Sequence, residues 1–235
     1  GPGGTGKSAL IKHIQENAIK RLLDIHVCAL TGCAAVLLNC KAKTVHSWAG
    51  IGIGKASIET LVHKINNNRF LKQIWKNTDI LVIDEVSMMS KVLFEKLDAI
   101  GKAIRRNQRP FGGIQLIFSG DFYQLPPVPD KDDPETGKFC FESELWFETF
   151  SPNNHIKLTK IFRQTDPIWQ KCLNQLREGR IKITMNNLLL DIVANKKINE
   201  NTLIKPTKLF PTRNQVDQIN TAEMDKTNRY YRKKL

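Results

Sequence analysis

Short apolar runs alternate with amphipathic segments along the first half of the chain. Helical spacing of apolar residues follows Lys7, and a short apolar run at Ile25–Leu30 comes after it. A helix of small residues at Cys33–Leu38 then precedes further apolar runs at Ile80–Ile83 and Ile114–Phe118. Short apolar runs bounded by turn residues are typical of strands that are buried on both faces. The alternation of helices and strands therefore predicts an α/β fold with a mostly parallel sheet.

Periodicity and turn residues predict several further elements. The segment Ile58–Trp75 is basic and amphipathic with a turn expected at Asn66–Asn68, and Val92–Arg106 has the apolar spacing of a helix. Later in the chain the pattern predicts a short helix within Leu145–Phe150, a strand at His155–Leu158, a helix between Asp166 and Gly179, a helical stretch at Ile181–Glu200, and a strand end at Leu209–Arg213 before a helix from Asn214. These elements continue the α/β pattern beyond the first strands.

The segment Thr44–Gly54 breaks this regularity, because glycines and alanines are mixed with polar and aromatic residues. Two interpretations stay open. In one, the segment is a surface loop with a packed Trp48. In the other, it contacts a nucleic-acid strand: His46 and Ser47 hydrogen-bond phosphates, and Trp48 supports or stacks a base.

The first eight residues, Gly1–Ser8, fit the pattern G-x-x-x-x-G-K-[ST] at every fixed position. Glycines allow successive N–H groups to point at one phosphate, and the following helix adds its free N–H groups and the positive end of its dipole. Lys7 would reach the β- and γ-phosphates, and the Ser8 hydroxyl would bind Mg²⁺. The alternative is a Gly-rich turn without a ligand. We expect the nucleotide to be held by Gly3, Gly4, Thr5, Gly6, Lys7 and Ser8.

Two carboxylates, Asp84 and Glu85, directly follow the apolar run at Ile80–Ile83. Ligands of open parallel sheets bind at the carboxyl ends of the strands, so both side chains should face the nucleotide. Asp84 would hold Mg²⁺ directly or through water, and Glu85 would orient and deprotonate the attacking water. An apolar run that ends in Asp-Glu is weak evidence for a catalytic site by itself. The complete phosphate loop upstream strengthens this evidence.

A third strand end delivers Asp121 and Gln124 to the same edge of the sheet. A glutamine in this place can bond the γ-phosphate or the attacking water and can report the nucleotide state to neighbouring loops. The alternative is a turn stiffened by proline. Arg163 follows another predicted strand and suits an arginine finger that neutralises the transferring phosphoryl group, although a plain surface charge also explains it.

The charge of the chain points to a polyanionic partner. It has 36 Lys and Arg against 23 Asp and Glu, a formal net charge of +13 over 235 residues. Attraction to nucleic acid is the most direct consequence, and a merely solvated basic surface is the alternative. The basic residues cluster at Lys64–Lys76, Lys102–Arg109 and Lys226–Lys234, which favours a binding face.

Cysteine usage indicates the cellular compartment, and hydropathy indicates whether the chain has a membrane span. The five cysteines make an odd count without a C-x-x-C pair, which suggests neither a disulfide framework nor a zinc site, so we expect a reducing, intracellular compartment and buried, inert thiols. No apolar run approaches the length of a membrane span. The phosphate loop begins the chain without the strand that should precede it, so we expect a fragment of a longer protein.

The motifs together identify a family. The stretches Gly1–Ser8, Leu30–Ala35, Thr44–Gly52, Asp84–Met88, Gly120–Val128 and Ile161–Gln164 have the order and form of the Pif-one DNA helicases, a RecD-like branch of superfamily one. Residues Val86–Arg106 and Phe210–Asn220 also resemble this family. The resemblance covers essentially the whole chain.

The resemblance implies a three-layer, RecA-like P-loop NTPase fold in a first motor domain at residues 1–205, with a small wedge-like insertion near 51–75 and the start of a second motor region at 206–235. It implies an ATP-dependent 5′ to 3′ DNA helicase of genome maintenance, with Mg²⁺ as metal and single-stranded DNA and DNA junctions as partners. Matching motif positions gives Lys7, Ser8, Asp84, Glu85, Gln124 and Arg163 the roles reasoned above. Thr31, His46, Ser47 and Trp48 become candidate DNA contacts.

Four questions stay open from the sequence. The isolated chain could be a nucleotide- and DNA-binding module without unwinding activity. A P-loop kinase is a rival enzyme class, disfavoured because Asp84–Glu85 and Asp121–Gln124 suit attack by water. The compartment would be the nucleus or mitochondrion in a eukaryote and the cytoplasm in a virus or bacterium, and the sequence does not give the oligomeric state.

Overall fold

The structure is a computed structural model that describes residues 1–195 and 207–232. The chain divides into two compact units, Gly1–Met185 and Asn186–Leu235, which are described separately. The domain boundary expected between residues 205 and 206 lies outside the described residues. It therefore stays a prediction.

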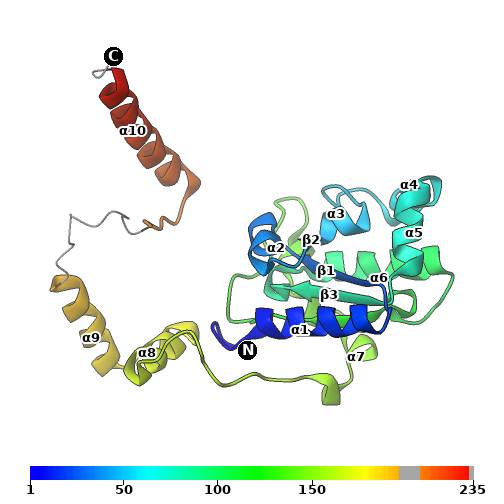
Figure 1. The fold of residues 1–235 in the computed structure, drawn as a ribbon, viewed down its shortest axis with the longest axis horizontal. Coiled ribbons are helices and arrows are strands. Elements are labelled where there is room, and N and C mark those ends of the chain that lie inside the picture. The colour runs from blue at the N-terminus through cyan, green and yellow to red at the C-terminus, as the bar shows by residue number, and fades with distance from the viewer. Residues whose placement is uncertain (196–206, 233–235) are drawn as a thin grey trace. The chain divides into compact units, whose positions relative to one another are not determined.

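A four-stranded parallel sheet forms the centre of the first unit (Figure 1). Its order is β2 (Lys43–Thr44), β1 (Ile25–Ala29), β3 (Ile80–Asp84) and β4 (Gln115–Phe118). β1 pairs with β2 and β3, and β3 pairs with β4, in every case in parallel. The predicted α/β fold with a parallel sheet is confirmed.

Helices cover both faces of the sheet, which gives three layers (Figure 1). On one face Val27, Ala29, Ile80 and Val82 share a core with residues of α1 (Lys7–Lys20) and α2 (Gly32–Leu38). On the other face Cys28, Leu81 and Ile83 share a core with residues of α3 (Val45–Ala49), α4 (Ile58–Asn67), α5 (Arg69–Asn77) and α6 (Lys91–Arg105). Alternate residues of each strand thus enter opposite cores, because successive side chains of a strand point to opposite faces.

The later elements are helical. They are α7 (Leu145–Thr149), α8 (Pro167–Arg177), α9 (Ile183–Ala194) and α10 (Arg213–Arg232). Short 3₁₀ turns lie at Val86–Met88, Pro110–Gly113, Pro134–Gly137, Cys140–Glu142 and Pro152–Asn154. Asp166 caps α8 by accepting hydrogen bonds from the N–H groups of Ile168 and Trp169, and Gly179 follows that helix with a left-handed φ of 66°. No helix among the described residues is long and apolar enough to cross a bilayer.

Three expectations about strands were wrong in detail. The run at Ile114–Phe118 forms β4, but its residues are only partly buried or exposed, because β4 has a strand neighbour on one side only among the described residues. The segments His155–Leu158 and Leu209–Arg213 contain no strand. An extended segment becomes a strand only where a neighbouring backbone pairs with it, and sequence patterning does not show whether that neighbour exists.

The segment Thr44–Gly54 is more regular than the sequence suggested. Thr44 accepts a hydrogen bond from the Ser47 N–H at 3.2 Å and caps α3, so Trp48 enters the core with 1% of its surface exposed. Its ring lies 4.6 Å from that of Trp75, between centroids. The packed interpretation describes Trp48, and a base-stacking role does not fit its burial.

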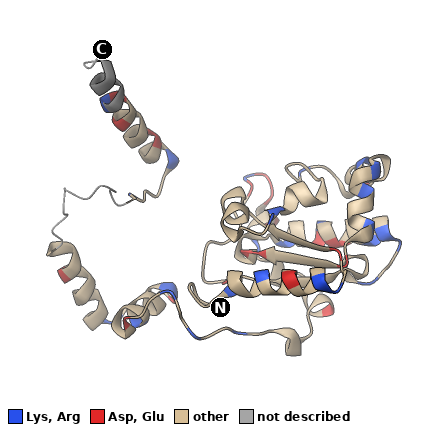
Figure 2. Cartoon of the chain, in the orientation of Figure 1, with Lys and Arg blue, Asp and Glu red and all other residues tan. Residues whose placement is uncertain are grey.

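Figure 2 marks the Lys and Arg positions along the ribbon. Some cations of the predicted basic face make contacts inside the first unit. Arg105 donates hydrogen bonds to the carbonyl oxygens of Trp75, Lys76, Thr78 and Gly112, which ties α5 to α6. Lys102 pairs with the buried carboxylate of Asp98 at 2.7 Å. These two cations are therefore engaged inside the unit, whereas Arg106 and Arg109 are exposed.

The cysteines only partly match the expectation that all are buried. Cys28, Cys140 and Cys172 are buried, and burial raises the pKa of Cys28 to about 12. Cys33 is exposed and Cys40 is half-buried. Helix α2 turns Ala35 and Leu38 to the core, which leaves Cys33 facing solvent.

Candidate nucleotide-binding site

The phosphate loop has the backbone that its glycines predicted. Gly4 and Gly6 adopt left-handed φ angles of 78° and 88°, which other residues rarely adopt. α1 begins at Lys7 without a side-chain cap, so the first N–H groups of the helix point out of its end. Thr5 is buried, and its hydroxyl donates to the carbonyl oxygen of Pro2 at 2.8 Å. The result is a concave, donor-rich turn at a helix N-terminus, the arrangement that binds phosphate.

Lys7 folds back over this loop. Its Nζ donates to the carbonyl oxygens of Gly1 and Pro2, at 2.7 and 2.9 Å. Ser8 lies exposed in the first turn of α1. Lys7 thus lies against the loop, and the roles of Lys7 and Ser8 toward phosphate and Mg²⁺ stay predictions.

Asp84 and Glu85 lie at the carboxyl end of β3, as expected. Asp84 is 5% exposed and pairs in register with Ala29, and its Oδ1 has no hydrogen-bond partner. Glu85 has a left-handed φ of 57°, a strained conformation that is typical of functional sites when a residue other than glycine adopts it. Burial raises the pKa of Glu85, the charge of Asp84 raises it further, and Lys7 opposes both.

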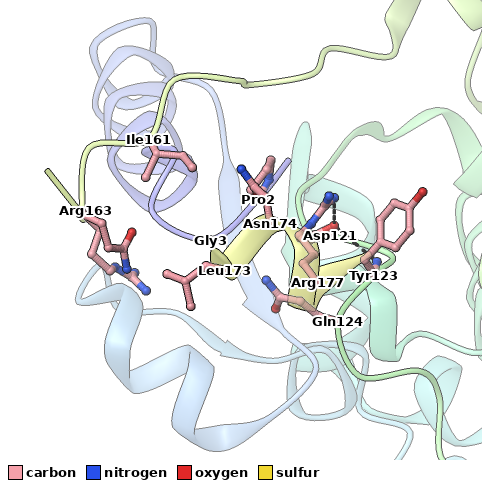
Figure 3. Close-up of a pocket in the computed structure, with 11 residues that line it drawn as sticks. Pro2, Gly3, Asp121, Tyr123, Gln124, Ile161, Arg163, Leu173, Asn174 and Arg177 are labelled. Atoms are coloured by element: carbon pink, nitrogen blue, oxygen red, sulfur yellow. Dashed lines mark hydrogen bonds and ion pairs between the residues drawn. The ribbon is translucent and has the colours of Figure 1, made fainter. Parts of the chain in front are cut away.

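A pocket of about 260 Å³ lies between the turn that follows β4 and the phosphate loop (Figure 3). Gly3, Gln124 and Arg163 all line it, although they come from three separate segments. The N–H of Phe162 donates to the carbonyl oxygen of Gly4 at 2.8 Å, which holds Arg163 against the loop. A Cβ on Gly4 would lie 2.6 Å from the Cβ of Arg163, so the close approach requires glycine. Arg163 takes part in no ion pair with the described residues.

Arg177 also lines this pocket, and sequence reasoning missed it. Its Nε and Nη2 donate to Oδ2 and Oδ1 of Asp121, each at 2.6 Å, and its guanidinium lies 4.3 Å from the centroid of the Tyr123 ring. Asp121 and Arg177 are 56 positions apart, so no local pattern links them. The glycine two residues after Arg177, which ends α8, was the nearest sequence signal.

The ion pair sets the charge state of Asp121. Burial by itself would raise the pKa of Asp121, but the hydrogen bonds from Arg177 and from the Tyr123 N–H, together with nearby positive charge, outweigh it and hold that pKa below its ordinary value of 3.8. Only 2% of the Asp121 side chain is exposed. The carboxylate is therefore ionised at neutral pH and is held in one orientation by a bidentate contact.

Asp121→Asn is expected to lower the free energy of unfolding by about 3–5 kcal/mol at neutral pH, because Arg177 loses its largely buried partner. A lowered folded-state pKa means that the pair stabilises above pH 3.8 and that this contribution is lost as pH falls through the folded pKa. Urea denaturation at several pH values measures the difference, which should shrink in acid. Asp132→Asn, an exposed control, should change stability by less than about 0.5 kcal/mol. Equal stability of Asp121→Asn and the wild type at neutral pH would contradict the prediction.

The candidate DNA contacts share the edge of the sheet that carries Asp84. Ala29 pairs in register with both Thr44 and Asp84, which brings the ends of β1, β2 and β3 together. Thr31 caps α2 just after β1 by accepting a hydrogen bond from the Ala34 N–H. Ser47 is exposed and His46 half-buried, and burial lowers the pKa of His46. Thr31, His46 and Ser47 stay predictions as DNA contacts.

Comparison with known proteins gives consistent matches. A family model described as PIF1-like helicase matches residues 1–202. The ATP-dependent DNA helicase RRM3 of Saccharomyces cerevisiae is 40% identical over 226 residues, which cover 95% of this chain and 30% of that protein. The crystal structure of Pif1 helicase from Candida albicans matches with a TM-score of 0.83 at 38% identity, over 94% of this chain and 49% of that chain. Pif1 helicase from Bacteroides, in complex with ADP-AlF3 and single-stranded DNA, matches with a TM-score of 0.78 at 27% identity, over 94% and 51%. The chain thus spans less than a third of the length of RRM3.

Proposed function

This chain belongs to the PIF1-like helicase family, and from that premise we propose that it is the ATP-hydrolysing motor domain of an ATP-dependent 5′ to 3′ DNA helicase. The observation that carries the proposal is the pocket at which Gly3, Gln124 and Arg163 meet, beside the strand end with Asp84 and Glu85. Bacteroides Pif1 was solved with ADP-AlF3 and single-stranded DNA, which supports the same two ligands here.

Each residue of the site has its own role in phosphoryl transfer to water. The phosphate loop binds the triphosphate through its N–H groups, and Lys7 exchanges its contacts with Gly1 and Pro2 for phosphate oxygens. Glu85 accepts the proton of the attacking water, and its raised pKa makes it a stronger base than an ordinary glutamate. Gln124 orients this water or the γ-phosphate, and Arg163 stabilises the charge that develops on the transferring group.

Mg²⁺ fits the side chains of this site. Asp84 has a buried carboxylate oxygen without a partner, and such an oxygen is the type of ligand that Mg²⁺ prefers. Ser8 would supply a hydroxyl from the first turn of α1. When bound, the ion would neutralise charge on the β- and γ-phosphates.

For the intact protein, the proposed partners are single-stranded DNA and DNA junctions, with roles in repair, recombination, replication or telomere maintenance. Thr31, His46 and Ser47 would contact the strand from the same edge of the sheet, and residues 51–75 would act as the wedge. We retain residues 1–205 as the first motor domain and 206–235 as the start of the second. A reducing compartment is part of the same proposal.

Lys7→Ala is expected to reduce ATP hydrolysis stimulated by single-stranded DNA by about 10²–10³-fold, because it removes a positioned cation from the transferring phosphate. The measurement is phosphate release with and without single-stranded DNA, on the full-length protein. Lys20→Ala removes an exposed charge from the last turn of the same helix and should leave the rate unchanged. Normal turnover of Lys7→Ala would exclude the proposed function.

Two alternatives are separated by the same assay. A P-loop kinase would transfer phosphate to an acceptor and release little free phosphate without one. A nucleotide- and DNA-binding module would bind single-stranded DNA in a salt-sensitive manner without hydrolysis. DNA-stimulated phosphate release by the wild type, together with strand separation on a duplex with a 5′ single-stranded tail, supports the helicase.

A further inference from the structure

Helix α8 contacts both of the segments that bring side chains to the proposed γ-phosphate position. Near its carboxyl end, Arg177 holds the carboxylate of Asp121 through two hydrogen bonds of 2.6 Å. Near its amino end, the Nε2 of Gln170 donates to the carbonyl oxygen of Gln164, the residue after Arg163. One rigid helix therefore touches the segments of both Gln124 and Arg163.

Asp121 links Arg177 to Gln124 through backbone hydrogen bonds. Its carbonyl oxygen accepts the Gln124 N–H at 2.8 Å, and its Oδ1 accepts the Tyr123 N–H at 3.3 Å. The turn that carries Gln124 is thus fixed around the Asp121 side chain. Gln124 is itself exposed, so its position depends on this turn rather than on packing of its own side chain.

We propose that Arg177 is a positioning residue for ATP hydrolysis: through Asp121 it anchors the Gln124 turn to α8, which sets the spacing between Gln124 and Arg163 at the pocket. The inference rests on the proposed function. Catalysis of phosphoryl transfer depends mainly on positioning and electrostatics, and a displacement of about 1 Å can reduce a rate by about 10²-fold. A helix that fixes the spacing between two catalytic side chains therefore has a direct effect on turnover.

The charges of Arg177 and Asp121 predict opposite effects of their neutral variants on nucleotide affinity. Arg177 and Asp121 both line the pocket, and they neutralise each other. Arg177→Gln leaves an unpaired carboxylate beside the phosphates and should weaken nucleotide binding, whereas Asp121→Asn leaves an unpaired guanidinium and should strengthen it. Both variants should lose kcat. A pair that only stabilises the fold would not shift affinity in opposite directions.

The test compares the kcat of ATP hydrolysis at saturating ATP and the Kd of ADP in Arg177→Gln, Asp121→Asn, their double variant and Arg177→Lys, on full-length protein. Arg177→Lys keeps the charge and loses the planar two-point contact. We expect kcat to fall by about 10²-fold in every one of these variants. The ADP Kd should rise in Arg177→Gln, fall in Asp121→Asn, and stay near the wild-type value in the double variant and in Arg177→Lys.

Arg180→Gln is the matched control, because Arg180 is exposed just beyond the end of α8 and should change neither quantity. Thermal melting establishes that each variant is folded, and Arg177→Lys carries the test if a neutral variant is not. Wild-type kcat in folded Arg177→Lys, or ADP affinities that move in the same direction in the two neutral single variants, would overturn the inference while the helicase function stands. A wild type without ATP hydrolysis would overturn both.

Discussion

Replacing Arg163 with alanine is expected to lower the kcat of DNA-stimulated ATP hydrolysis by about 10³–10⁵-fold, the range of an arginine that stabilises charge in phosphoryl transfer. The side chain is exposed, lines the pocket and has no carboxylate partner among the described residues, so its charge is available to the γ-phosphate. Alanine retains the Cβ that packs against Gly4, so the loop should keep its shape. The measurement is phosphate release at saturating ATP and single-stranded DNA.

Two further variants make this result specific. Arg163→Lys keeps the charge without the planar fork and should fall between the wild type and the alanine variant. Lys160→Ala removes a neighbouring cation, which lies 5.1 Å from the centroid of the Phe162 ring, and should keep nearly normal turnover. A turnover of Arg163→Ala close to that of Lys160→Ala would show that Arg163 is a surface charge.

Glu85→Gln is expected to reduce kcat by about 10²–10⁴-fold and to leave nucleotide binding in place, because the amide cannot accept the proton of the attacking water. Glutamine has the size and shape of glutamate. It meets the same backbone strain at the left-handed φ of 57° that Glu85 adopts. Phosphate release reports the chemistry, and titration with a fluorescent ATP analogue reports binding.

The control for Glu85 is Glu16→Gln, which neutralises an exposed carboxylate on α1. This variant should retain both hydrolysis and binding. Normal hydrolysis by Glu85→Gln would remove Glu85 from the mechanism, and loss of binding together with hydrolysis would assign it to the phosphate site instead of to proton transfer.

Local sequence was enough to predict which residues line most of the candidate nucleotide site. The phosphate loop follows from a contiguous motif, because glycine is the residue that adopts the left-handed conformations of Gly4 and Gly6. Asp84 and Glu85 follow from an apolar run that ends in two carboxylates, and Gln124 follows from the next strand end. Parallel strands end at one edge, so the order of elements was enough to bring these residues together.

Contacts between distant segments were not accessible in the same way. Arg105 and Arg109 belong to the same basic cluster of the sequence. Arg105 nevertheless donates hydrogen bonds to carbonyl oxygens of α5, whereas Arg109 is exposed. Trp48 suited both a base contact and a core, and the ring of Trp75 decides for the core. The extended residues His155–Leu158 have the pattern of a strand and form none.

By itself the sequence determined the α/β class, the family and the residues of the phosphate loop and its strand-end partners, because each rests on neighbours within a few positions. Only the tertiary structure decided which charges are engaged internally, that Trp48 is buried, and that Arg177 holds Asp121 at the wall of the pocket beside the phosphate loop. The physical reason is that an ion pair or a core contact depends on where two separate segments are placed by the whole fold, and residue type alone does not specify that distance.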